Sequence, residues 1–184
     1  MQRSKVEIPS YMTKVVKLLS VLMLLIIFTS FRSKNKSVPA YYIVISKHSY
    51  ELTVYDDRGW LVKYPVVFGN NDLGDKMKEG DRETPEGTFT IISKRVHEKW
   101  DRFMMLDYPT AESYEKFRQR KAQGLIPKDA QIGGGVGIHG TWPHEGYAVD
   151  RYENWTEGCI SLKNEDVEEL FNMVPVGTKV IVRQ

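Results

Sequence analysis

The chain has 184 residues, the length of one domain, and its single cysteine excludes an intramolecular disulfide or a cysteine-rich metal cluster. A hydrophobic share of 41% with 27% charged residues is too apolar for a disordered chain. The 26 basic and 24 acidic residues nearly balance, so we expect no nucleic-acid partner, which would usually select a basic stripe.

The charge is unevenly distributed along the chain. Residues 1–36 hold seven basic residues and one acidic residue, a net charge of +6, whereas residues 37–184 hold 19 basic and 23 acidic residues, a net charge of −4. The basic flanks enclose an apolar run at 18–28. As a helix, residues 15–31 would span roughly 26 Å, which is short for a bilayer core of ~30 Å but suits a signal sequence.

We therefore expect residues 1–36 to be a basic segment with a hydrophobic signal or anchor helix, its basic end on the cytoplasmic side. Residues 37–184 would then form an extracytoplasmic domain in the cell envelope, either anchored to the membrane or secreted. The pattern leaves open whether the helix is cleaved. A buried core helix is the alternative, and the cationic flanks with no polar face argue against it.

Strand patterns dominate the predicted domain. Aromatic, β-branched or alternating segments fall at residues 41–46, 51–55, 60–68, 88–93 and 179–182. Turn residues at 56–59 join the second and third of these as a hairpin, and the polar stretch at 69–80 reads as a loop.

Two helices are predicted among these strands. Residues 111–123 form one, stopped by a glycine. A second begins at Asn164 as N-cap, with Val167, Leu170, Phe171 and Val174 at helical spacing. Strands with one or two short helices predict a β-dominated α+β domain.

The chemistry concentrates between residues 132 and 162, where His139 and Cys159 are each flanked by glycine and β-formers. This composition suits side chains presented at the edge of a sheet. Only a few per cent of a thiol is ionised at neutral pH, and an imidazole can raise that share by taking the proton and forming an ion pair. The backbone N–H of Gly158 or of Cys159 is a candidate donor to an oxyanion.

Composition alone leaves other interpretations open. A lone cysteine is more often a small buried apolar residue than a nucleophile. His144 is an alternative general base. A metal site built from His139, His144, Asp150 or Glu157 would match no strong ligand spacing, so we expect no metal and no cofactor.

The residues quoted above resemble the L,D-transpeptidase catalytic domain of the YkuD type. The resemblance rests on Ile138-His139-Gly140-Thr141 followed by Thr156-x-Gly158-Cys159-Ile160, and on the segment Thr84-Pro85-Glu86-Gly87-Thr88-Phe89. It covers about residues 40–184. Such a domain would be a β-sandwich or a pair of mixed sheets.

By this resemblance Cys159 would be the nucleophile, His139 its general base, and the Gly140 carbonyl would orient the imidazole. The enzyme would acylate itself with a peptidoglycan stem tetrapeptide and transfer the acyl group to an amine of a second stem or of an envelope protein. Carbapenems would acylate it as mimics of the donor. Thr141, Gly158 and Tyr108, which lies in a Tyr-Pro segment, are candidate substrate or oxyanion residues.

Two residues depart from the family pattern. Glu157 stands where the family usually has a second histidine, and Ser161 where it usually has an arginine that helps to bind substrate. A carboxylate beside the thiol also disfavours the thiolate. These departures keep two alternatives open: a cysteine-dependent hydrolase of stem peptides or of protein–peptidoglycan links, and a non-catalytic wall-binding module.

Overall fold

The computed structural model describes Tyr11 and residues 40–184. The predicted signal or anchor helix falls, apart from Tyr11, outside these residues. Within the described part of the chain, no helix is both long enough and apolar enough to cross a membrane.

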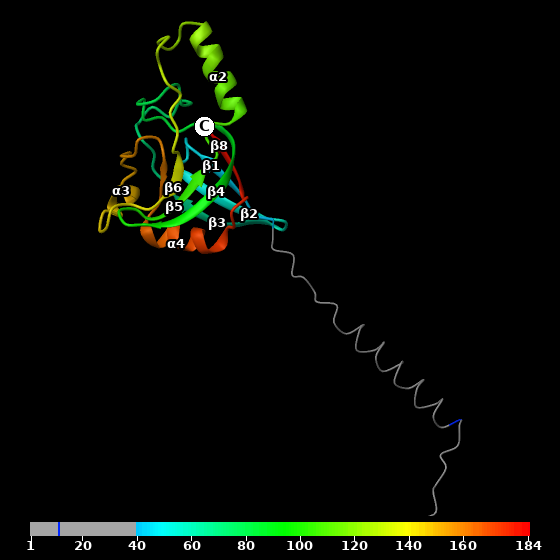
Figure 1. The fold of residues 1–184 in the computed structure, drawn as a ribbon. Helices are drawn as coiled ribbons and strands as arrows, with labels where there is room; N and C mark the ends of the chain where they lie inside the picture. Colours follow the sequence, from blue (N-terminus) through cyan, green and yellow to red (C-terminus); the bar gives the residue numbers. More distant parts are fainter. Residues whose placement is uncertain (1–10, 12–39) are drawn as a thin grey trace, which may run out of the picture. The chain divides into compact units, whose positions relative to one another are not determined.

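Eight strands form one sheet in the order β3-β2-β1-β8-β4-β5-β6-β7 (Figure 1). Their bounds are Tyr42–Ser46 (β1), Glu51–Asp56 (β2), Gly59–Pro65 (β3), Gly87–His97 (β4), Asp101–Leu106 (β5), Gly137–His139 (β6), Ile160–Ser161 (β7) and Lys179–Arg183 (β8). The sheet is mixed, because β1–β8 and β6–β7 pair in parallel whereas the other pairs are antiparallel. The predicted β-dominated α+β class is confirmed.

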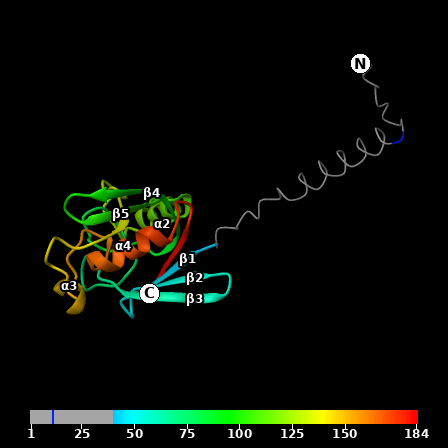
Figure 2. The same ribbon diagram turned by 90° about the horizontal axis from the view of Figure 1, so that it is seen from below.

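The long strand β4 joins two halves of this sheet. Its first residues pair with β8 and its later residues pair with β5, with a shift of register between Ile91 and Ser93. Figure 2 shows the consequence: β4 and β5 lie on one side of the molecule, and β1, β2 and β3 lie on the other. The candidate catalytic strands β6 and β7 extend the β5 side.

The core lies on one face of the central strands. β1 and β8 alternate buried and accessible residues, as strands with one covered face do, and Ile43 and Ile45 are fully buried. The helix α4 (Asn164–Met173) buries Val167 and Leu170 in the same core. The predicted helical spacing of apolar residues is thus the stripe that attaches α4 to the sheet.

Among residues 40–184, three helices accompany the sheet: α2 (Ala111–Ala122), α3 (Tyr147–Asp150) and α4. The first and third match the predicted helices, although Lys163 and not Asn164 is the N-cap of α4. α3 was not predicted, because a four-residue helix is too short to display a period.

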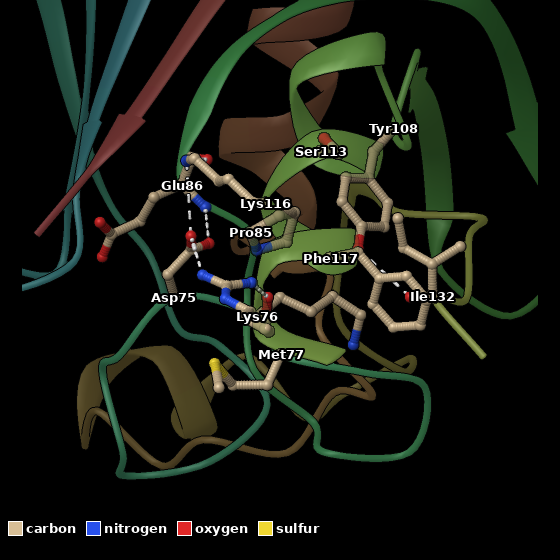
Figure 3. Close-up of a pocket in the computed structure, with 11 residues that line it drawn as sticks. Asp75, Lys76, Met77, Pro85, Glu86, Tyr108, Ser113, Lys116, Phe117 and Ile132 are labelled. Carbon is tan, nitrogen blue, oxygen red and sulfur yellow. Dashed lines mark hydrogen bonds and ion pairs between the residues drawn. The ribbon is translucent and has the colours of Figure 1, made fainter. Parts of the chain in front are cut away.

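The helix α2 is attached by charge, since it buries none of its residues. Arg120 and Lys116 reach the Asp75 carboxylate at 2.7 and 3.4 Å, and Lys116 also donates to the Glu86 carbonyl at 3.1 Å (Figure 3). Thr110 begins the helix by accepting the Ser113 N–H.

The strand β5 also escaped prediction. Phe103, Met104 and Leu106 are all buried, so this strand lacks the alternation that marks a half-exposed strand. It nevertheless pairs with β6 and places the Phe103 ring beside the candidate site.

Candidate active site

The parallel pairing of β6 with β7 decides where His139 and Cys159 lie. His139 pairs with Ser161, and Cys159 comes directly before β7, two positions ahead of Ser161. Because side chains two positions apart in an extended segment point to the same face, this register predicts that His139 and Cys159 face the same side of the sheet. Two segments separated by about twenty residues in sequence are brought together by this ladder.

The His139 ring is held by one hydrogen bond and by aromatic contacts. Its Nδ1 lies 2.7 Å from the Gly140 carbonyl oxygen, which can only accept, so Nδ1 carries the proton and Nε2 holds the lone pair. The ring stacks on Trp100 at 4.8 Å and meets Trp155 edge-on at 5.5 Å. This burial lowers the pKa of His139 to about 4.

Cys159 is partly accessible and lines a cavity of about 550 Å³. Its Sγ lies 3.7 Å from the Gly135 carbonyl oxygen. Burial raises the pKa of the thiol, against the opposing effects of a backbone hydrogen bond from Gly137 and of the charge of Lys76. Burial thus disfavours the charged form of both the thiol and the imidazole.

The turn before Cys159 is fixed by the Thr156 hydroxyl. It donates to the Cys159 carbonyl at 2.8 Å and accepts the Gly158 N–H at 3.1 Å. The Gly158 N–H is thus occupied, which leaves the N–H of Cys159 as the other donor of this turn. Gly158 has φ +119°, and a Cβ there would lie 2.7 Å from the Glu83 carbonyl oxygen.

Three of the residues singled out in the sequence are buried away from this cavity. Ser161 is fully buried, and its hydroxyl donates to the Gly140 carbonyl at 3.3 Å, while Thr141 is 1% exposed. Tyr108 donates to the Ile132 carbonyl at 3.2 Å and lines a separate small cavity beneath α2, where Figure 3 shows its hydroxyl directed at Ile132. Burial raises the pKa of Tyr108. In this structure Ser161 supports the carbonyl that orients His139.

Glu157 lines the cavity and is exposed. Its carboxylate pairs with the Arg82 guanidinium at 3.4 Å, and Arg82 is fixed in turn by the carbonyls of Trp155 and Thr156 at 3.1 and 3.2 Å. The negative charge that the sequence places beside the thiol thus has a partner, which reduces its effect on Cys159.

Sequence reasoning missed several charged and aromatic residues of the cavity wall. Lys76, Arg95, Trp100 and Phe103 all line the cavity, and the Arg95 guanidinium lies 5.2 Å from the centre of the Phe103 ring. Arg95 lies on the extended strand β4, and Lys76 lies in a polar loop, so neither carries a local motif. Their role follows only from the long-range pairing that builds the cavity.

The remaining candidates do not gather at the cavity. His144 is exposed in a turn after Trp142 and does not line the cavity with Cys159. Among residues 40–184, no group of three or more histidine, cysteine or acidic side chains is arranged to hold a metal ion.

The family model and the curated relative that match this chain both point to the same family. The family model of the YkuD L,D-transpeptidase catalytic domain matches residues 40–182. YqjB of Bacillus subtilis, named as a candidate L,D-transpeptidase, is 28% identical over 145 residues, which cover 77% of this chain and 70% of YqjB.

Two solved structures share the fold. The helical cell shape determining protein Pgp2 of Campylobacter jejuni matches with a TM-score of 0.58 and 24% identity over 85% of this chain and 53% of its own. The avibactam carbamoyl enzyme of the protein Ldtfm matches with a TM-score of 0.53 and 20% identity over 79% of this chain and 49% of its own. The chain spans about half the length of each of these structures. Together with the match over residues 40–182, the fold and the placement of His139 and Cys159 lead to one conclusion: the chain belongs to the YkuD family of L,D-transpeptidase catalytic domains.

Proposed function

We propose that this protein is a peptidoglycan L,D-transpeptidase that uses Cys159 as its nucleophile and His139 as the general base. The β6–β7 register supports the proposal, because it pairs His139 with Ser161, two positions after Cys159, and Cys159 lines a cavity of about 550 Å³. The Gly140 carbonyl, which fixes the proton on Nδ1, supports a role for Nε2 as the acceptor of the thiol proton.

In the acylation step the His139 Nε2 takes the Sγ proton while the sulfur attacks the carbonyl carbon of the stem peptide, between its diamino acid and terminal D-alanine. The tetrahedral intermediate collapses to a thioester, and the departing D-alanine amine takes the proton from His139. An amine of a second stem or of an envelope protein then attacks the thioester, and Cys159 recovers a proton through His139. Neither step needs a redox change.

The oxyanion of the intermediate needs a hydrogen-bond donor. Thr156 already accepts the Gly158 N–H, so we assign this role to the backbone N–H of Cys159. A single donor of this kind is typically worth ~2.7–4 kcal/mol.

The cavity also suggests how the donor peptide is held. Ser161 is neutral and buried, so it cannot supply the charge of the arginine that the family usually has there. Arg95 supplies a guanidinium on the cavity wall instead, positioned over the Phe103 ring. We infer that Arg95 binds a carboxylate of the stem peptide. Arg95→Gln should raise KM for the tetrapeptide about tenfold with little change in kcat, whereas Arg58→Gln in the exposed β2–β3 turn should change neither.

The site of action follows from the substrate. Peptidoglycan stems lie outside the cytoplasmic membrane, so we infer that residues 37–184 work in the cell envelope. The carbamoyl adduct that avibactam forms on Ldtfm supports the expectation that carbapenems acylate Cys159.

Incubation of the full chain with tetrapeptide muropeptides tests the proposal. Crosslinked dimers and released D-alanine are expected, and both should disappear in Cys159→Ala. If the products are shortened monomers without dimers, the protein is a hydrolase of stem peptides and not a transpeptidase.

Intact-mass analysis after carbapenem treatment tests whether the protein is catalytic at all. An adduct that is absent from Cys159→Ala supports acylation chemistry. A folded protein that forms no adduct would support the non-catalytic wall-binding module.

A further inference from the structure

A buried lysine lies in the wall of the cavity that contains Cys159. Lys76 is 6% exposed, and its Nζ lies 2.6 Å from the Asp81 carboxylate and 3.4 Å from the Glu83 carbonyl oxygen. The same Nζ would be 3.7 Å from a Cβ placed on Gly158, the residue before Cys159. The Lys76 amino group therefore lies directly against the backbone that presents the thiol.

The partner of this lysine is itself held rigidly. The Asp81 carboxylate accepts the backbone N–H groups of Met77, Lys78 and Glu83 at 2.7, 2.8 and 3.0 Å. These bonds and the Lys76 ammonium keep the pKa of Asp81 below its ordinary value despite burial. Arg120 of α2 donates to the Lys76 carbonyl and fixes the backbone from the other side.

The other charged groups near the thiol are paired, exposed or kept neutral by burial. Glu157 is paired with Arg82, while Glu79 and Arg95 line the cavity at exposed positions. Burial and the neighbouring acid Asp81 raise the pKa of Glu83, which favours its neutral form. Burial also keeps His139 neutral at pH 7. Lys76 is thus the buried cation of the cavity wall.

We propose that Lys76, held by Asp81, is a positioning residue that stabilises the negative charge on the Cys159 sulfur when its proton passes to His139. The inference rests on the proposed function only in taking Cys159 as the nucleophile. Because burial keeps His139 neutral before the reaction begins, the developing thiolate needs an opposite charge that is already present. Lys76 supplies that charge. The Asp81 carboxylate, 2.6 Å away, partly offsets the effect of the lysine charge on the thiol.

The pH dependence of Cys159 alkylation tests this role. Cys159 is the single cysteine of the chain, so the mass increase produced by iodoacetamide reports on it alone. In the full chain, Lys76→Met should move the midpoint of alkylation about one pH unit upward. Asp81→Asn should move the midpoint downward, because the lysine charge then has no acidic partner. A merely structural pair would move both midpoints in the same direction or neither.

Lys47 offers a matched control, because it is a second buried lysine with a carboxylate partner. It is 1% exposed and pairs with Glu86 at 2.8 Å, but it does not line the cavity. Lys47→Met should lower the melting temperature and leave the alkylation midpoint unchanged.

Two results would overturn the inference. One is a folded Lys76→Met protein with the wild-type midpoint. The other, decisive if Lys76→Met does not fold, is an Asp81→Asn protein whose midpoint does not fall. Lys76→Arg, which retains the charge, should keep the midpoint near that of the wild type. Because no peptidoglycan is used, a failure of the proposed transpeptidase activity would be seen separately in the muropeptide assay.

Discussion

Two regions of different construction meet at Cys159. The strand pair β6–β7 places His139 and the residues that directly follow Cys159 through a parallel ladder of backbone hydrogen bonds. The loop at residues 69–86 has no regular strand, and side chains bonded to backbone groups hold it in place. Asp81 accepts three backbone N–H groups, Asp75 accepts the Glu86 N–H at 2.7 Å, and Asn70 donates to the Asp81 carbonyl at 2.8 Å.

The two regions contribute different parts of the candidate site. The strand pair holds the groups proposed to react, and the loop holds the charged residues around them. A ladder fixes positions as closely as a strand register allows, which suits the proposed nucleophile and its proposed base. A loop fixed by carboxylates can bring a buried lysine close to the turn that precedes Cys159, as Lys76 is brought to Gly158. Changes in β6–β7 should therefore abolish the chemistry without unfolding the protein, whereas changes in the loop or at its contact should alter both.

The largest effect is expected from Cys159→Ala. Loss of the sulfur removes the only thiol, so turnover of muropeptides should fall to background. The side chain is partly accessible and its replacement keeps the backbone of the turn, so the melting temperature should change by only a few degrees. A product yield near that of the wild type would refute the mechanism.

His139→Gln should lower kcat/KM by about 10² to 10⁴, because the glutamine keeps much of the volume but offers no base. The double variant with Cys159→Ala should be no slower than Cys159→Ala alone, since nucleophile and base act as a unit. Additive losses in the double variant would mean that His139 acts elsewhere.

The buried imidazole also makes stability depend on pH. The pKa of His139 is lowered from about 6.5 in the unfolded chain to about 4 in the folded protein. Between these values the unfolded chain binds the additional proton, so stability falls as the pH drops from 6.5 towards 4. Urea unfolding at pH 7 and pH 4.5 should show a loss of about 2–3 kcal/mol that His139→Gln lacks. An equal loss in both proteins would place the titrating group elsewhere.

The same division explains what could be predicted from sequence. Hydrophobic residues that repeat every two positions predict strands, and those that repeat every 3.6 positions predict helices. These local patterns predict the β2–β3 hairpin, the apolar stripe on α4 and the β-dominated class. The glycine-flanked His139 and Cys159 could be singled out because their neighbours are short and β-forming. α3 and β5 could not, since one is too short for a period and the other is buried without alternation.

The charged surroundings could not be predicted, because they depend on contacts between distant segments. Lys76 lies over 80 residues before Cys159 in a polar loop, where a lysine is usually solvated. Tyr108 was singled out by a family segment, yet its hydroxyl is bonded to the Ile132 carbonyl beneath α2. A motif thus identifies a residue as distinctive without fixing which cavity it faces.

The contact between the two regions gives the smallest and most specific prediction. Gly158→Ala adds a Cβ 2.7 Å from the Glu83 carbonyl oxygen at φ +119°, so both the contact and the backbone are strained. Gly124→Ala is the control, since Gly124 has φ +71° with no atom within 4 Å of the added Cβ. Gly158→Ala should lower the free energy of unfolding by about 2 kcal/mol more than Gly124→Ala does, and only Gly158→Ala should raise the midpoint of Cys159 alkylation. If the two variants lose the same stability and have the same alkylation midpoint, the loop moves to accept the added Cβ at no cost. In that case β6–β7 alone sets the reactivity of the thiol.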